Sequence, residues 1–404
     1  MRGSFVELDD LLCRIEAGKS PMADDVPAGH GEWGVLKVSA IQGGRFVARE
    51  NKAVRDASLI QPLYEVRPGD LLMTRANTEE LVGLACVAVA PPPRLMLSDK
   101  TLRLVVNESL ADPAFLALVL AQPSLRQRIR SLATGTSGSM KNIGQEQIRR
   151  LPVPDISLAE QRRIVAAYEA IERRIAVLER VCDKRRTVQS ALIARSSVPG
   201  NRRIPLKSWL QRIEAGKSPL AEGFPAGPGE WGVLRVSAVQ AGRFVARENK
   251  VLRDPSLISP QYEVREGDLL MTRANTEDLV GLACVAHQPP PRLMMSDKTL
   301  RLVLDESVAV AAYVEAVLAS SEVRVQIKAA ATGTSGSMKN IGQAAIERLA
   351  VPDVPVHEQR RVSDALLWSR KQVEVLGRQI EKLHVVQQGL VEDLLSGRVR
   401  VPLG

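Results

Sequence analysis

A turn built from small and hydrogen-bonding residues is the stretch of this sequence best suited to holding an anion. It reads Gly-Thr-Ser-Gly-Ser-Met-Lys-Asn over residues 135–142 and places hydroxyls, a lysine and an amide beside two glycines. Phosphate oxygens are commonly held by such hydroxyls, by backbone N–H groups and by lysine. The pattern is equally typical of a tight turn that enters a helix, with Asn142 as a local cap. The residues predicted here to contact phosphate are Thr136, Ser137, Ser139, Lys141 and Asn142.

A polar loop that follows a predicted strand carries a second set of candidate residues. Arg75, Asn77 and Thr78 lie in this loop. Arginine suits the guanine edge and asparagine the adenine edge in the major groove, so the loop is a candidate for reading bases. Other residues are candidate phosphate contacts, although many of them can be ordinary solvated charges. These further candidates are Lys19, Ser20, Arg45, Arg94, Lys100 and Arg103.

Every one of these residues recurs 198 residues further along the chain. Residues 133–145 and 331–343 are identical, and no insertion breaks the register between the two copies. A period of about 200 residues is the size of an independent folding unit with its own core. The chain therefore uses one module twice. The corresponding candidates in the second copy are Lys217, Ser218, Arg243, Arg273, Asn275, Thr276, Arg292, Lys298, Arg301, Thr334, Ser335, Ser337, Lys339 and Asn340.

Motifs for catalysis or cofactor binding are incomplete in this sequence. Gly18-Lys-Ser20 resembles the end of a phosphate-binding P-loop, but Cys13 stands where that motif needs its first glycine. Gly135-Thr-Ser-Gly-Ser139 has serine in place of the last glycine of a nucleophile elbow. The four cysteines show no CxxC spacing, so we expect neither a metal site nor a catalytic centre.

Composition favours a DNA duplex as the partner. The 404 residues are 45% hydrophobic and carry a formal net charge of +9, which favours DNA, RNA or an anionic membrane surface. Aromatic residues make up 3% of the chain, too few for the stacking platforms of single-strand binders. The sequence has no apolar run long enough to span a membrane, so a cytoplasmic location is expected.

Each repeat is predicted to form a mixed α/β domain followed by a long helix, which makes the fold class α+β. Short β-rich runs such as residues 33–38 and 70–74 are separated by glycine and proline turns. Ser157 and Glu160 have the spacing of a capping box and predict the start of a helix. The expected boundaries are domains at 1–156 and 196–354, with helices at 157–195 and 355–404.

Apolar residues in both predicted helices recur alternately four and three residues apart, as in a coiled coil, and only Ser369 interrupts the pattern. Charged residues flank this stripe, and the two stripes correspond position by position. We therefore expect the two helices to pair with each other, while packing of each helix on its own domain is the alternative. The stripe comprises Ile164, Tyr168, Ile171, Ile175, Leu178 and Cys182 in the first helix, and Val362, Leu366, Val373, Leu376, Ile380 and Leu383 in the second.

Together these segments resemble the specificity (S) subunits of type I restriction-modification systems. The resemblance rests on GTSGSMKNI, LPVPDISLAEQRRIV and the C-terminal LVEDLLSGRVR, and it covers nearly the whole chain. It implies two target-recognition domains on an antiparallel coiled coil of two helices, each domain reading half of a bipartite double-stranded DNA site. It also implies two methyltransferase subunits that methylate adenine and restriction subunits that translocate and cleave DNA. S-adenosylmethionine, ATP and Mg would then belong to those partners, and this chain would be non-catalytic.

One feature departs from that family's usual pattern. Its two recognition domains usually differ, whereas residues 33–52 and 231–250 of this chain differ only at Lys37/Arg235, Ile41/Val239 and Gly43/Ala241. Equal domains related by a pseudo-two-fold axis must read equal half-sites in inverted orientation. The sequence therefore predicts a palindromic, interrupted target.

Three other interpretations of the sequence stay open. The chain can belong to a related methylation-only or other restriction assembly. It can also be a self-contained DNA methyltransferase or nuclease, although the cofactor motifs of such enzymes are not found. A scaffold whose basic character serves only solubility or RNA binding is the third interpretation. Salt-dependent, sequence-selective binding to duplex DNA separates it from a DNA-recognition subunit.

Overall fold

Two units make up the chain in the computed structural model, which describes residues 4–137, 140–196, 202–335 and 338–395. Residues 1–178 and 379–404 form the first unit, and residues 179–378 form the second. Each unit contains one mixed α/β head, residues 5–154 or residues 203–352. Each unit also contains part of the long helices α4 (Leu158–Ser196) and α8 (Val356–Leu395). The mixed α+β architecture with two long helices confirms the predicted fold class.

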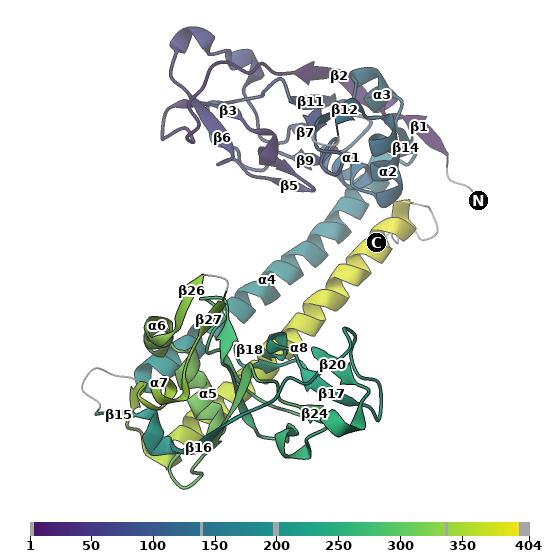
Figure 1. Cartoon of the computed structure of the whole chain (residues 1–404). Coiled ribbons are helices and arrows are strands. Elements are labelled where there is room, and N and C mark those ends of the chain that lie inside the picture. The colour runs from purple at the N-terminus through teal and green to yellow at the C-terminus, as the bar shows by residue number, and fades with distance from the viewer. Residues whose placement is uncertain (1–3, 138–139, 197–201, 336–337, 396–404) are drawn as a thin grey trace. The chain divides into compact units, whose positions relative to one another are not determined.

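The N-terminal head is built around a four-stranded antiparallel sheet in the order β2-β11-β7-β9 (Figure 1). Successive side chains of a strand point to opposite faces of a sheet. In this sheet the side chains on both faces are buried, each in a separate core. Leu71 and Met73 pack with helices α1 and α2 on one face, whereas Leu72 and Cys86 pack into a separate core on the other. The elements are β2 (Leu12–Ala17), β7 (Leu71–Thr74), β9 (Ala85–Val87), β11 (Thr101–Val106), α1 (Pro113–Leu120) and α2 (Pro123–Leu132).

The second core of the head lies beneath a smaller sheet in the order β10-β3-β6 and a short hairpin of β4 and β5. Burial of Leu36, Ile41 and Leu95 against Leu72 joins this layer to the central sheet. These strands are β3 (Trp33–Leu36), β4 (Ile41–Gln42), β5 (Arg45–Phe46), β6 (Asn51–Val54) and β10 (Leu95–Met96). The β-rich runs predicted at residues 33–38 and 70–74 are thus confirmed as β3 and β7.

Two further small sheets complete the head. The first joins β1 to β14, and the second has the order β12-β13-β8. Pro152 and Pro154 lie in strand β14, outside the long helix that follows. The remaining elements are β1 (Phe5–Glu7), β8 (Ala76–Asn77), β12 (Thr134–Ser137), β13 (Met140–Asn142), α3 (Gln145–Arg149) and β14 (Pro152–Pro154).

The C-terminal head repeats this arrangement with the same pairings and the same order of elements. Its helices are α5 (Ala311–Ala319), α6 (Ser321–Ala330) and α7 (Gln343–Glu347). Its strands are β15 (Arg203–Pro205), β16 (Leu210–Ala215), β17 (Trp231–Leu234), β18 (Val239–Gln240), β19 (Arg243–Phe244), β20 (Asn249–Leu252), β21 (Leu269–Thr272), β22 (Ala274–Asn275), β23 (Ala283–Val285), β24 (Leu293–Met294), β25 (Thr299–Leu304), β26 (Thr332–Ser335), β27 (Met338–Asn340) and β28 (Ala350–Pro352).

A buried glutamine fastens each head to the start of its long helix. The Gln161 side chain accepts from the Asp112 N–H at 2.9 Å and donates to the carbonyls of Leu110 at 3.1 Å and Ile156 at 3.0 Å. Gln359 makes the three corresponding bonds in the other unit. The predicted cap is also present, since the Glu160 N–H donates to the Ser157 hydroxyl at 3.3 Å.

Within each unit, part of α4 packs against part of α8. In the first unit Ile164 shares a core with Leu394, and Gln387 donates to Glu172 at 2.6 Å, so the two segments run antiparallel. In the second unit Gln189 donates to the Ser369 hydroxyl at 3.0 Å. The predicted pairing of the helices is thus confirmed, and the alternative holds at their starts, where Ile164 also packs into the core of its own head.

The predicted apolar stripe contributes unevenly to this packing. Its fully buried members are Ile164, Ile175, Leu178, Cys182 and Leu366. The other members are half-buried, namely Tyr168, Ile171, Val362, Val373, Leu376, Ile380 and Leu383. Among the described residues, no helix is long and apolar enough to cross a membrane.

Candidate nucleic-acid interface

The two predicted groups of DNA-contacting residues meet in one small sheet of each head. Strand β13, from the glycine-rich turn, pairs with β8, from the polar loop, and places Lys141 opposite Asn77 and Asn142 opposite Ala76. The same pairing joins β27 to β22 in the C-terminal head. We call each set of three strands, β12-β13-β8 and β26-β27-β22, the hairpin sheet of its head.

Glycine is required in the first strand of the hairpin sheet. Gly135 has φ +148°, and a Cβ atom there would lie 2.3 Å from the Met140 carbonyl oxygen. This close crossing lets the Lys141 ammonium fold back and donate to the Gly135 carbonyl at 3.2 Å. Lys339 and Gly333 repeat the contact at 3.0 Å. The lysine is thus held beside the backbone that carries the hydroxyl residues.

Several residues that the sequence predicted to contact DNA lie in or next to the gaps between the described ranges. The side chains of Thr136, Ser137, Thr334 and Ser335, together with residues Ser139 and Ser337, fall outside the described residues. Asn142 and Asn340 are exposed on β13 and β27.

Arg75 links the hairpin sheet to a second basic segment. Its backbone N–H donates to the Lys100 carbonyl at 2.8 Å, and its carbonyl accepts from the Ile143 N–H at 3.0 Å. The side chains of Arg75 and Lys100 are both exposed. Arg273 makes the same two backbone bonds in the other head, to Lys298 and Ile341. Arg75, Lys100 and Lys141 therefore lie on connected segments.

Asn77 and Thr78 shape the turn that follows β8. The Asn77 side-chain oxygen accepts from the Thr78 N–H at 2.9 Å, and the Thr78 carbonyl accepts from the N–H groups of Leu81 and Val82. Asn275 and Thr276 repeat this turn. Asparagine oxygens that bond a neighbouring N–H stabilise tight turns, so Asn77 has a structural role beside any contact with DNA.

The Gly-Lys-Ser segment is a close backbone crossing. A Cβ atom on Gly18 would lie 2.1 Å from the Leu97 carbonyl oxygen, and the Lys19 N–H donates to that oxygen at 3.2 Å. The Ser20 hydroxyl bonds to Asp99, and the Lys19 side chain is exposed. The second copy repeats this crossing with Lys217 and Ser218, which bond to Met295 and Asp297.

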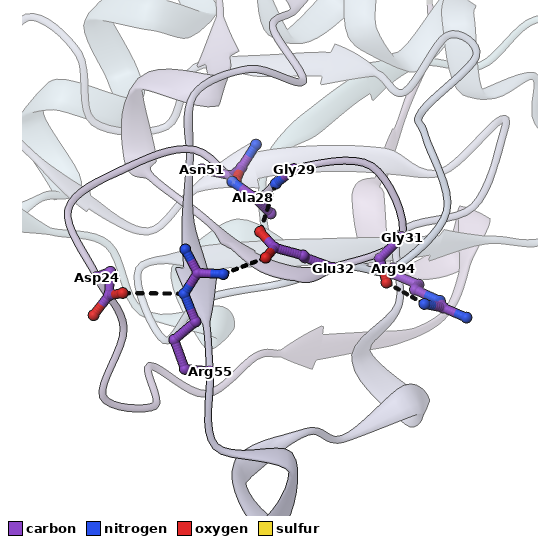
Figure 2. Close-up of polar contacts among 8 residues, drawn as sticks. All are labelled: Asp24, Ala28, Gly29, Gly31, Glu32, Asn51, Arg55 and Arg94. Atoms are coloured by element: carbon purple, nitrogen blue, oxygen red, sulfur yellow. Dashed lines mark hydrogen bonds and ion pairs between the residues drawn. The ribbon is translucent and has the colours of Figure 1, made fainter.

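Arg94 braces a loop in the N-terminal head, as Figure 2 shows. Its guanidinium donates to the Gly31 carbonyl, and its own backbone lies in the left-handed region at φ +65°. Arg292 makes the same contact with Gly229. Arg45 and Arg243 are exposed on the short hairpins β4–β5 and β18–β19, which pack on β9 and β23.

The prediction that Arg103 and Arg301 contact phosphate is wrong. The Arg103 guanidinium is buried and lies 2.8 Å from both Glu16 and Asp70. Arg301 pairs at 2.9 Å with Glu214 and Asp268. β11 and β25 are central strands with a neighbour on each side, so Arg103 and Arg301 are enclosed and need carboxylate partners, unlike the exposed Arg14 on the edge strand β2.

Two lysines that the sequence did not single out, Lys37 and Lys52, line a hollow together with Lys100. This hollow of about 510 Å³ is lined by Ser20, Lys37, Lys52 and Lys100 among other residues. Lys52 lies opposite Val35 in the β3–β6 pairing, which brings it near Lys37 at the end of β3. The register between β3 and β6 would have shown that these two lysines lie close together, but this register cannot be predicted from the sequence alone.

Comparisons with known proteins point to one family, although no family model matches the chain. The chain is 29% identical over 166 residues to the type I restriction enzyme EcoEI specificity subunit of Escherichia coli. This match covers 41% of the chain but only 28% of that relative. The EcoKI specificity subunit of Escherichia coli strain K12 is 24% identical over 390 residues, with 90% of the chain and 82% of the relative covered.

Solved structures of the same class share the fold. The S subunit of a type I restriction-modification system from M. genitalium matches with a TM-score of 0.61 and 13% identity, over 98% of this chain and 96% of that one. A chain from a structure on the complex assembly and conformational transition of the type I R-M system gives 0.58 and 18%, over 98% of both. In sequence and in fold, the chain is therefore similar to type I restriction-modification specificity subunits, which confirms the resemblance inferred from its motifs.

Proposed function

We propose that this chain is the DNA-recognition subunit of a type I restriction-modification assembly and that each head contacts duplex DNA through its hairpin sheet. The observation that carries the proposal is the pairing of β13 with β8. It brings Arg75, Asn77 and Lys141 together from segments far apart in the sequence, and it does so in both heads. A cation, an amide and nearby hydroxyls are the groups that hold phosphates and read base edges.

The two heads would read equal half-sites in inverted orientation. Their hairpin sheets have the same sequence, and Gln161 and Gln359 attach the heads to equivalent helix starts by equivalent bonds. An antiparallel helix pair relates its two members by a two-fold axis. Heads attached equivalently to those members would follow the same axis and favour a palindromic, interrupted site.

The long helices would recruit two methyltransferase subunits, and restriction subunits would join that assembly. Apolar side chains are exposed along both helices, including Val188 at 52%, Trp368 at 58% and Val385 at 71%. Exposed apolar side chains of this kind are typical of a surface that a partner protein covers. In this proposal the partners bind S-adenosylmethionine, ATP and Mg, and this chain has no catalytic step of its own.

Replacement of the hairpin-sheet arginine tests DNA contact directly. The double variant R75A/R273A should bind duplex DNA more weakly by about 1–3 kcal/mol per lost contact and should show a shallower salt dependence. R14A/R212A is the matched control, because Arg14 and Arg212 are exposed arginines that occupy equivalent positions on β2 and β16. Fluorescence anisotropy at several salt concentrations measures both. Equal affinities of the two variants would refute the proposed interface.

Charge reversal at the helix starts tests partner recruitment. Replacing Arg162, Arg163, Arg360 and Arg361 by glutamate should weaken assembly with the methyltransferase while DNA binding by the chain alone persists. Co-purification of the two proteins measures assembly. Undiminished assembly would contradict a role for this surface.

A further inference from the structure

The loop at residues 24–32 and its counterpart at residues 222–230 are held by corresponding bonds but differ in charge between the two heads. In the N-terminal head Arg55 bridges Asp24 and Glu32, and the Asn51 side chain accepts from the Ala28 N–H at 2.8 Å (Figure 2). In the C-terminal head Arg253 bridges Glu222 and Glu230, and Asn249 accepts from Ala226 at 2.8 Å. The backbone of the loop is therefore braced by corresponding bonds in both heads.

Within this braced loop, Asp25 of the first head corresponds to Gly223 of the second. The Asp25 carboxylate lies 3.1 Å from the Lys52 ammonium and 3.4 Å from the Lys37 ammonium. Hydrogen bonds from Lys52 and then Lys37 hold the pKa of Asp25 below its usual value, so the carboxylate is ionised at neutral pH. Two of the three lysines that line the hollow in this head thus already share one internal carboxylate, which cancels one of their two positive charges.

In the second head the corresponding cations are Arg235 and Lys250. Arg235 donates to the backbone carbonyls of Gly223 and Asn249, which are neutral acceptors, and Lys250 is exposed. Two cations and a carboxylate in the first head therefore become two cations and a glycine in the second. The first head thus carries one more negative charge, that of Asp25, and both of its lysines contact the same oxygen of this carboxylate.

We infer that these cations form a phosphate-binding site on each head, and that Asp25 competes with the DNA phosphate in the N-terminal head while the C-terminal head is free of this competitor. The inference rests on the proposed binding of duplex DNA. Continuity with the hairpin sheet supports it, because Lys100 lines the hollow and its carbonyl accepts from the Arg75 N–H. A carboxylate held by two ammonium groups occupies the same kind of position as a phosphate oxygen.

The two heads would then grip the DNA backbone unequally while they read the same bases. A phosphate that displaces Asp25 must break two ion pairs before it gains the same two contacts. In the second head Lys250 is exposed and Arg235 donates only to neutral carbonyls, so a phosphate there breaks no ion pair with a carboxylate. The C-terminal head therefore provides the stronger anchor.

Exchange of the two residues between the heads tests this inference. Asp25→Asn should raise the affinity for an arbitrary duplex, and G223D should lower it. Because one phosphate contact changes the salt exponent by about 0.9, the affinity of each variant relative to the unchanged protein should itself change about threefold between about 50 and 200 mM salt. Gly223 tolerates the change, because its φ is not in the left-handed region and a Cβ atom there meets nothing within 4 Å. Asp24→Asn is the matched control, as its carboxylate lies on Arg55 and not on the lysines.

The measurement is anisotropy of a labelled duplex of about 30 base pairs, titrated with full-length protein between about 50 and 200 mM salt. Opposite shifts for Asp25→Asn and G223D, with Asp24→Asn close to the unchanged protein, support the inference. If the unchanged protein binds but both variants match it, or if Asp24→Asn gains as much as Asp25→Asn, the inference fails alone. If the unchanged protein shows no salt-dependent binding, the proposed function fails with it. Thermal unfolding of each variant verifies that the fold is kept.

Discussion

Individual arginines in this chain have different roles that their sequence context does not distinguish. Arg75 is exposed beside the hairpin sheet, Arg94 braces a loop, and Arg103 is buried between Glu16 and Asp70. The carboxylate partners of Arg103 come from other strands or turns, so only the pairing of β11 with β2 and β7 reveals them. From the sequence alone an arginine in a strand is expected to be exposed, so the burial of Arg103 could not be predicted.

The cysteines provide a test at the scale of single residues. Burial raises the pKa of Cys86 and of Cys284 to about 12, whereas Cys13 is exposed. A group with so high a pKa stays protonated near pH 8, and the thiolate is the reactive form. We expect a thiol reagent to label Cys13 rapidly in the native protein, and Cys86 and Cys284 only after unfolding. Mass spectrometry of labelled peptides checks this, and rapid native labelling of either buried cysteine would contradict the packing.

At the scale of elements, the sequence predicted the helices and strands whose formation depends on residues close together in the chain. The helix start after Ser157, the strands at residues 33–36 and 71–74 and the stripe of α4 follow from capping, alternation and periodicity. The pairing of β13 with β8 could not be predicted, because it joins segments more than sixty residues apart. The hollow with Lys37 and Lys52 depends in the same way on the register between β3 and β6.

A buried ion pair fastens the C-terminal head to α8 and is specific to that head. Glu315, 1% exposed, accepts from the Val285 N–H at 2.9 Å and pairs with Arg370 of α8. The corresponding residues of the first head are Ala117 and Glu172, which cannot form this pair. The Glu315–Arg370 pair thus attaches the C-terminal head to α8 through residue types that the first head lacks at these positions.

Removal of one partner of this pair should destabilise the protein more than removal of both. R370M leaves Glu315 buried without its cation and should cost about 3 kcal/mol of unfolding free energy, because an uncompensated buried charge is costly. E315Q/R370M should cost less than R370M alone, because glutamine is neutral and keeps an acceptor for the Val285 N–H. Arg378→Met is the control, since Arg378 pairs with Glu374 at the surface and should cost under about 1 kcal/mol. Urea unfolding measures all three, and a double variant less stable than R370M would contradict the argument.

At the scale of the whole molecule, the two copies have the same sequence in the hairpin sheets, which are proposed to read bases. They differ in sequence at positions elsewhere that change the charge of each head. The hairpin sheets are identical in sequence, whereas Asp25 and Gly223, and Ala117 and Glu315, differ between the heads. Identical contacts specify identical bases, and unequal phosphate contacts change affinity without changing sequence preference. We therefore expect equal half-sites that are bound with unequal strength.

Selection of bound duplexes from a randomised library, with the chain in the proposed assembly with methyltransferase subunits, tests the central claim most directly. We expect enrichment of a single half-site that appears twice, in inverted orientation, around a gap of fixed length. Enrichment of two unrelated half-sites, or of the same half-site as a direct repeat, would contradict it.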